Sequence, residues 1–173
     1  MNILVLGDIM GLSGRIALKK NLSKVIHDNK INFSIINGEN AADDGRGITK
    51  DIAEEFFLQG IDVITSGNHI WDKEETTNYI DKEKRLLRPA NLVNGSPGNG
   101  FGIFQSKDKK YKIGVINLMG NVFMRKTEDV FKTVQEICKK IVLRKNVDFL
   151  VVDFHGEITS EKMAMGHYLD GIT

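Results

Sequence analysis

Side chains able to bind a metal ion or transfer a proton occur in four short segments of this 173-residue sequence. Each segment ends or directly follows a run of apolar residues. The segments are GDIMG, NGEN, SGNH and DFHGE, and the side chains are Asp8, Glu39, Asn40, Asn68, His69 and His155. Carboxylate, amide oxygen and imidazole form the mixed ligand set typical of Mn²⁺, Fe or Zn²⁺. The sequence therefore predicts a metal site, provided that the four segments meet in space.

The apolar runs indicate β-strands buried on both faces, because they are nearly continuous in apolar residues. They cover residues 2–7, 31–37, 61–66 and 147–154. Helical periodicity fills the intervals, over residues 14–28, 49–59, 73–79 and 127–145. This alternation predicts an α/β fold with parallel strand pairing. In open α/β sheets, ligands bind at the carboxyl ends of the strands, so the four segments can converge there.

Residues 87–117 interrupt the alternation. GFGIFQS and YKIGVIN flank a charged KDKK turn, which predicts an antiparallel hairpin. The glycine-rich stretch 91–100 before it predicts a loop. The sequence has no internal repeat, low-complexity tract or linker. We therefore expect residues 1–173 to form a single domain.

The composition is that of an ordinary globular protein, with 41% hydrophobic and 27% charged residues. The net charge is +1, so nucleic acid and anionic membranes are not expected partners. No apolar run approaches the roughly 18 residues that span a bilayer. The single cysteine, Cys138, cannot form an internal disulfide and fits a reducing compartment. We expect a cytoplasmic protein, with Cys138 in the core as part of helix 127–145.

Each candidate also has a purely structural explanation. Asp8 alone is compatible with a turn cap, and Glu39 with Asn40 is compatible with the chemistry of the turn that follows. His155 alone is compatible with a satisfied histidine near the core. The aspartates of the NGENAADD stretch are expected to be solvated, namely Asp43 and Asp44. Independent explanations at four strand ends would require a coincidence, which favours one shared site.

Two other kinds of site fit the sequence poorly. GDIMGLSG places glycines after the first strand, but it lacks the G-x-G-x-x-G spacing and the Lys-Ser/Thr pair of phosphate-binding loops. No serine lies in a G-x-S-x-G context, so an acyl-transfer triad is not supported.

Together the segments resemble the calcineurin-like metallophosphoesterases, through GD-x-x-G, N-G-E-N, G-N-H and a strand-end D-F-H. Longer blocks are similar to the bacterial YmdB-like branch of that family: NGENAADDGRGIT, TSGNHIWD, RPAN and DFHGEITSEKMAMG. The resemblance runs along the whole chain. It implies an α/β sandwich of mixed sheets flanked by helices. It also implies a metal-dependent phosphodiesterase, with a cyclic nucleotide of the 2′,3′ type as the favoured small-molecule substrate.

The resemblance implies a metal site with two divalent cations, Fe, Mn or Zn. Asp8 would bind the first cation, with Asn40 beside it, and Glu39 would bridge both. Asn68 and His155 would bind the second. Such a pair of cations activates a water and clamps the phosphoryl oxygens of an in-line displacement.

The resemblance gives His69 a different role from that of its neighbour Asn68. His69 would not bind metal but would stabilise or protonate the leaving oxygen, with Asp72 orienting its ring. This explains why an amide and an imidazole follow each other in TSGNHIWD: one faces the metal and the other faces the substrate.

The sequence departs from the family at two points. Met10 stands where the wider family has the histidine of a D-x-H motif, a histidine that the YmdB-like branch also lacks. The later G-T-H-T-H type block, which gives a histidine to each metal, has no counterpart before Thr173. His167 is expected to lie on a helix after Thr159 and not to replace these ligands. We therefore expect a fold that lacks its final strands.

Two alternatives follow from the missing block. One is a catalytically impaired remnant that binds metal or nucleotide without efficient turnover. The other is a homo-oligomer in which neighbouring chains complete the core.

Overall fold

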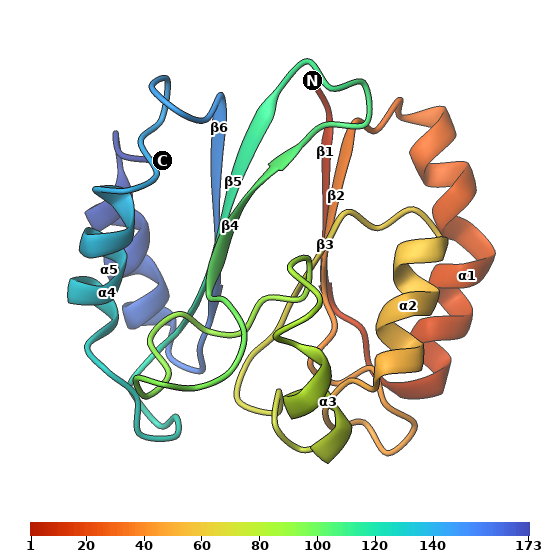
Figure 1. Ribbon diagram of the computed structural model, residues 1–173, viewed down its shortest axis with the longest axis horizontal. Coiled ribbons are helices and arrows are strands. Elements are labelled where there is room, and N and C mark those ends of the chain that lie inside the picture. Colours follow the sequence, from red (N-terminus) through yellow and green to blue (C-terminus); the bar gives the residue numbers. More distant parts are fainter.

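The chain folds into two β-sheets that lie between two layers of helices (Figure 1). A computed structural model describes all residues, 1–173. The sheets have the strand orders β1–β2–β3 and β4–β5–β6. The strands are β1 (Ile3–Asp8), β2 (Phe33–Asn37), β3 (Val63–Thr65), β4 (Phe101–Gln105), β5 (Lys112–Met119) and β6 (Phe149–His155). The helices are α1 (Gly11–Asp28), α2 (Lys50–Leu58), α3 (Glu74–Tyr79), α4 (Val130–Cys138) and α5 (Thr159–Leu169).

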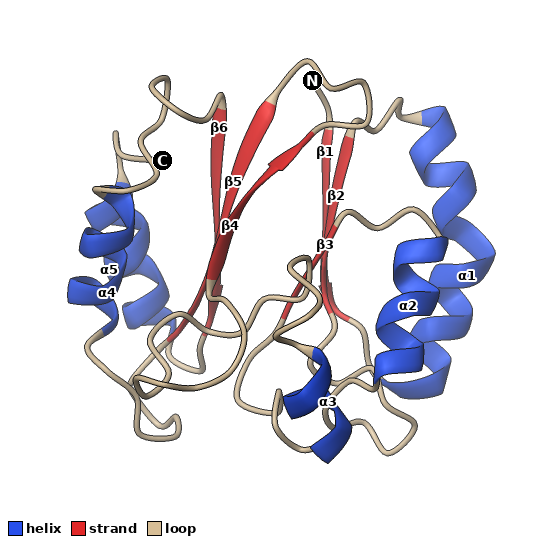
Figure 2. Ribbon diagram, viewed as in Figure 1, coloured by secondary structure: helices blue, strands red, loops and turns tan.

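The two sheets face each other in the interior, and helices cover their outer faces (Figure 2). α1 and α2 cover the first sheet, and α4 and α5 cover the second (Figure 1). An apolar cluster fills each sheet–helix interface, and a third lies between the sheets. The buried members of this third cluster are Phe33, Ile35, Val63, Leu87, Ile113 and Val115. The predicted α/β class, with mixed sheets flanked by helices, is confirmed.

The first sheet is entirely parallel, as predicted, with α1 and α2 as its crossover connections. β2 and β3 are buried along their whole length. The prediction of burial on both faces is wrong for β1 and for β6, because each lies at the edge of its sheet and has a neighbouring strand on one side only. Val5 of β1 is accordingly 57% exposed.

The second sheet contains the predicted hairpin, β4–β5, which is antiparallel. β6 pairs in parallel with β5, so that Met119 lies opposite His155. The fourth predicted strand therefore does not belong to the sheet that contains the other three. Its carboxyl end meets theirs because the two sheets pack face to face, and not because all four strands share one sheet edge.

The interior face between the sheets changes from apolar to polar toward the carboxyl ends of the strands. Alternate residues of a strand point to the same face. On β2 this face carries Phe33, Ile35 and then Asn37, and on β5 it carries Ile113, Val115 and then Asn117. The apolar part holds the sheets together, and the polar part forms directed bonds between them.

One such bond pair joins β5 to the end of β3. Asn117 is fully buried, and its Oδ1 accepts from the backbone N–H of Ser66 at 2.9 Å. Its Nδ2 donates to the backbone carbonyl of Ser66 at 3.0 Å. A weaker contact of 3.5 Å joins Asn37 Nδ2 to Asp153 Oδ2 of β6. Side chains thus supply, across the gap between the sheets, the hydrogen bonds that a strand ladder would otherwise supply.

The helix predicted over 127–145 is too long, because α4 spans Val130–Cys138. Asp129 begins it by accepting from the N–H groups of the first turn. Beyond its end, Asn146 Oδ1 accepts from the backbone of Val142 at 2.7 Å, and this local bond replaces a further helical turn. Cys138 is half-buried and packs against the core of the second sheet. No helix is long and apolar enough to span a bilayer.

We predict that Asn117→Leu lowers the free energy of unfolding by about 2–6 kcal/mol. Leucine has a similar volume but leaves the buried N–H and C=O of Ser66 without partners, at about 1–3 kcal/mol each. Denaturant unfolding measures the change. Asn78→Leu, at an exposed position of α3, is the matched control and should change the value by less than about 0.5 kcal/mol. Equal stability of the two variants would contradict the role of the Asn117 bonds.

Candidate metal centre

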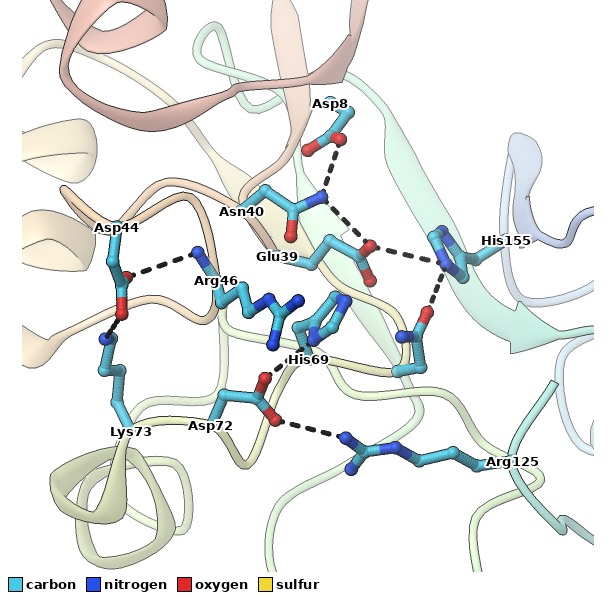
Figure 3. A network of polar contacts seen from close by, with 11 residues as sticks. Asp8, Glu39, Asn40, Asp44, Arg46, His69, Asp72, Lys73, Arg125 and His155 are labelled. Carbon is cyan, nitrogen blue, oxygen red and sulfur yellow. Dashed lines mark hydrogen bonds and ion pairs between the residues drawn. The ribbon is translucent and has the colours of Figure 1, made fainter.

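The five predicted ligand residues lie together at the carboxyl ends of β1, β2, β3 and β6, where the two sheets face each other (Figure 3). Asn40 Nδ2 donates to Asp8 Oδ2 at 2.7 Å and to Glu39 Oε1 at 3.2 Å. His155 Nε2 lies 3.4 Å from Glu39 Oε1 and 2.9 Å from Asn68 Oδ1. A continuous chain of contacts therefore links residues from both sheets that are up to 147 positions apart in the sequence.

Asp8 reaches this centre because β1 contains a bulge. Leu6 pairs with Ile36, but the next pair is Asp8 with Asn37, so Gly7 is an extra residue. Without it, Asp8 would share the face of Leu6, which packs toward the helices. A bulge shifts the alternation by one residue and re-aims the side chain. Asp8 thereby lies on the same face as Asn37, toward the second sheet.

Glu39 lies at the middle of the centre and is almost completely buried, at 2% exposure. Its backbone N–H donates to Asn37 Oδ1 at 3.1 Å, which fixes the turn after β2. Its Oε2 is buried without a hydrogen-bond partner. Burial, and then the nearby charge of Asp8, raise the pKa of Glu39 to about 7. A buried carboxylate oxygen without a donor is unfavourable, and a bound cation would offset that cost.

Gly67 leaves the space that Glu39 and His155 occupy. A Cβ at this position would lie 1.8 Å from Glu39 Oε2 and 2.5 Å from the His155 ring. Any larger residue would therefore displace one of the two. The glycine between Ser66 and Asn68 is required for the convergence of carboxylate and imidazole.

His155, the last residue of β6, is half-buried, and burial lowers its pKa. The neutral imidazole is the form that binds metal ions. Histidine and carboxylate side chains do not by themselves form a group of three that would hold a metal ion. The amides of Asn40 and Asn68 lie between or beside them and complete the set. With the unpartnered Glu39 oxygen, this set fits a divalent cation that accepts oxygen and nitrogen ligands.

His69 is directed differently from Asn68. Its Nδ1 lies 2.7 Å from Asp72 Oδ2, and the other oxygen of Asp72 lies 3.5 Å from Nη2 of Arg125 (Figure 3). No hydrogen bond of His69 Nε2 occurs within the chain, and 24% of the side chain is exposed. The geometry therefore agrees with an imidazole that Asp72 orients and whose second nitrogen is free.

The residues set aside as unlikely ligands lie away from the centre. Asp43 forms an ion pair with Arg15, and Asp44 forms one of 2.7 Å with Lys73. His167 is exposed on α5. None of these contacts involves the five predicted ligand residues.

Further residues, not predicted from the sequence, support the centre from the strands beneath it. Asn37 and Asp153 contact each other across the sheets, and Asn117 holds Ser66. A signal for Asp153 was present, because the alternation in VVDFH places it on the same face as His155. The pairing of Asn117 with Ser66 had no comparable signal, since it joins positions 51 residues apart.

Comparison with known proteins identifies relatives along the whole chain. A family model described as YmdB-like protein matches residues 4–173. The 2′,3′-cyclic-nucleotide 2′-phosphodiesterase of Bacillus subtilis (strain 168) is 41% identical over 171 residues, which cover 99% of this chain and 63% of that protein. This chain thus spans less than two thirds of that relative's length.

Solved structures agree with this relationship. The crystal structure of a phosphatase from Mycoplasma pneumoniae has a TM-score of 0.87 and 33% identity, and the match covers 98% of this chain and 60% of that one. A putative 5′-nucleotidase from Staphylococcus aureus has a TM-score of 0.64 at 16% identity, covering 98% of this chain and 42% of that one, and supports the fold alone. The fold is that of the calcineurin-like phosphoesterases, as the sequence resemblance implied. From the match along residues 4–173 and these relatives, the chain belongs to the YmdB-like protein family.

Proposed function

We propose that residues 1–173 form one domain that carries the metal centre of a phosphodiesterase acting on 2′,3′-cyclic nucleotides. The observation that carries the proposal is the position of Glu39, whose buried carboxylate lies between Asp8 with Asn40 and Asn68 with His155. Asp8, Glu39 and Asn40 would hold one divalent cation. Glu39, Asn68 and His155 would hold a second. The name of the Bacillus subtilis relative supports the substrate class.

Bound divalent cations would supply a Lewis acid and a water of lowered pKa. The chain itself supplies orientation and a proton. In hydrolysis, an oxygen–phosphorus bond forms to water and the bond from phosphorus to the 2′-oxygen breaks. His69 in its protonated form donates from both nitrogens. While Asp72 holds Nδ1–H, Nε2–H protonates the departing 2′-oxygen.

Binding without turnover is a second candidate function. The observation that favours it is that His155 supplies the one imidazole among the five proposed ligands. Carboxylate and amide oxygens predominate in this set and can bind a divalent cation, whereas turnover additionally requires an activated water. The experiments below separate binding from catalysis.

The test of the proposed function is hydrolysis of 2′,3′-cyclic AMP by the purified protein with Mn²⁺, followed by chromatography of the products. We expect 3′-AMP as the product, and its formation should stop when EDTA removes the metal. The 3′,5′-cyclic isomer is the control for substrate class. Metal-dependent stabilisation without any product would favour binding alone, and absence of both would contradict the proposal.

We predict that Glu39→Gln abolishes the stabilisation of the protein by Mn²⁺. A ligand at 100 times its Kd stabilises by about 2.7 kcal/mol, or about 5–10 °C in Tm for a protein of this size. Glu39 has a pKa of about 7 and must lose its proton to bind a cation. The Mn²⁺-induced rise in the Tm of the unsubstituted protein should therefore be smaller at pH 6 than at pH 8. Differential scanning fluorimetry measures it, and a normal shift in Glu39→Gln would exclude Glu39 as a ligand.

We predict that His69→Ala separates catalysis from metal binding. Turnover should fall by roughly 10²–10⁴-fold, the usual effect of removing a general acid. The Mn²⁺-induced rise in Tm should remain, because the His69 side chain contacts Asp72 and the alanine variant keeps the backbone group of residue 69 that lies beside Glu39. Loss of both together would place His69 among the metal ligands instead.

A further inference from the structure

Arg46, in the loop between β2 and α2, is a basic residue beside the site whose guanidinium has no hydrogen bond or ion pair within the chain. Its backbone N–H is engaged and donates to Asp44 Oδ1 at 3.3 Å. Figure 3 shows the Arg46 side chain pointing toward the ring of His69. We propose that Arg46 is a substrate-binding residue whose guanidinium contacts the phosphoryl oxygens of the substrate next to the leaving oxygen.

The loop that carries Arg46 is fastened to the segment that carries His69. On one side of Arg46, Asp44 forms an ion pair of 2.7 Å with Lys73. On the other side, Gly47 has φ +77°, and a Cβ there would lie 3.3 Å from the backbone oxygen of His69. Only glycine adopts this conformation readily at so close an approach. The ion pair attaches the loop to Lys73, and the close approach at Gly47 places Arg46 beside the segment from His69 to Lys73.

Three neighbouring basic residues are paired with carboxylates, whereas Arg46 is not. Arg125 contacts Asp72, Lys73 contacts Asp44, and Arg15 contacts Asp43. Each of these cations is at least partly neutralised by its carboxylate partner. Arg46 is exposed and retains its full set of donors.

An unpaired guanidinium at this place has the chemistry to recognise a phosphodiester. The centre itself carries the carboxylates Asp8 and Glu39, and Asp72 lies on the side of His69. These charges repel an anionic substrate wherever cations do not offset them. Arginine binds phosphate through two parallel hydrogen bonds, which a lysine cannot reproduce. This assignment rests on the proposed function, since it places the phosphoryl group between the metal centre and His69.

The experiment compares Arg46→Ala and Arg46→Lys with the unsubstituted protein. Lys20→Ala removes one positive charge from the exposed face of α1 and is the charge-matched control. With Mn²⁺ present, kcat/KM for 2′,3′-cyclic AMP should fall roughly 10–100-fold in Arg46→Ala, the usual effect of losing a hydrogen bond to a charged group. Arg46→Lys should recover part of the loss. Lys20→Ala should match the unsubstituted protein.

A second readout does not depend on turnover. Titration calorimetry with inorganic phosphate and the Mn²⁺-loaded protein should show binding weakened roughly 10–100-fold in Arg46→Ala, while the Mn²⁺-induced rise in Tm stays unchanged. If the unsubstituted protein shows no turnover, the proposed activity fails, but the phosphate titration still decides the role of Arg46.

Three results would overturn the assignment. If Arg46→Ala binds phosphate as tightly as the unsubstituted protein, Arg46 does not contact the phosphate. If Lys20→Ala weakens phosphate binding as much as Arg46→Ala does, the effect of Arg46→Ala is a general effect of charge. Loss of Mn²⁺ stabilisation in Arg46→Ala would show that the residue supports the loop and the metal centre instead.

Discussion

The paired hydrogen bonds between the Asn117 side chain and the backbone of Ser66 are the constraint on which the site depends. Apolar contacts between the sheets are not directional and tolerate sliding. Two bonds to a buried amide fix both the distance and the register, because leaving them unmade is costly. Ser66 comes two residues before Asn68, and Asn117 pairs with Asp153, two residues before His155. The bonds therefore hold Asn68 against His155 across two separate sheets.

The candidate metal centre is locally destabilising in the absence of a bound cation. A nearly buried carboxylate with a raised pKa and an unpartnered oxygen is unfavourable in the isolated chain. The surrounding fold compensates through the fully buried strands β2 and β3 and the apolar cluster between the sheets. Groups with strongly perturbed pKa values are frequent at functional sites, and a bound cation would offset the charge of the Glu39 carboxylate.

Asn68 and His69 are adjacent in sequence but have different partners, because the turn after β3 directs their side chains differently. Gly67 gives the space in which Glu39 and His155 meet, and Asn68 contacts His155. His69, one residue later, contacts Asp72 and leaves Nε2 free. In the proposed function this turn separates metal binding from proton transfer, and Arg46 approaches the same region from the loop after β2.

The sequence by itself determined where the four strands end, to within one residue, and which stretches between them are helical. Local periodicity is sufficient for this, since it records which side of an element is buried. It was sufficient for the hairpin β4–β5 and for naming the side chains that meet at the centre. It was not sufficient for the length of α4, because Asp129 starts the helix at Val130 and the Asn146 side chain binds the backbone of Val142 beyond its end.

Tertiary structure alone decided how these elements face one another. The apolar run of β6 has the same pattern whether the strand joins the first sheet or the second, and its pairing with β5 was settled by long-range packing. Likewise, the bulge at Gly7 that turns Asp8 inward is visible only when β1 is aligned with β2. Periodicity describes one element at a time, whereas a site built from several strand ends depends on contacts between residues distant in sequence, such as Asn117 with Ser66.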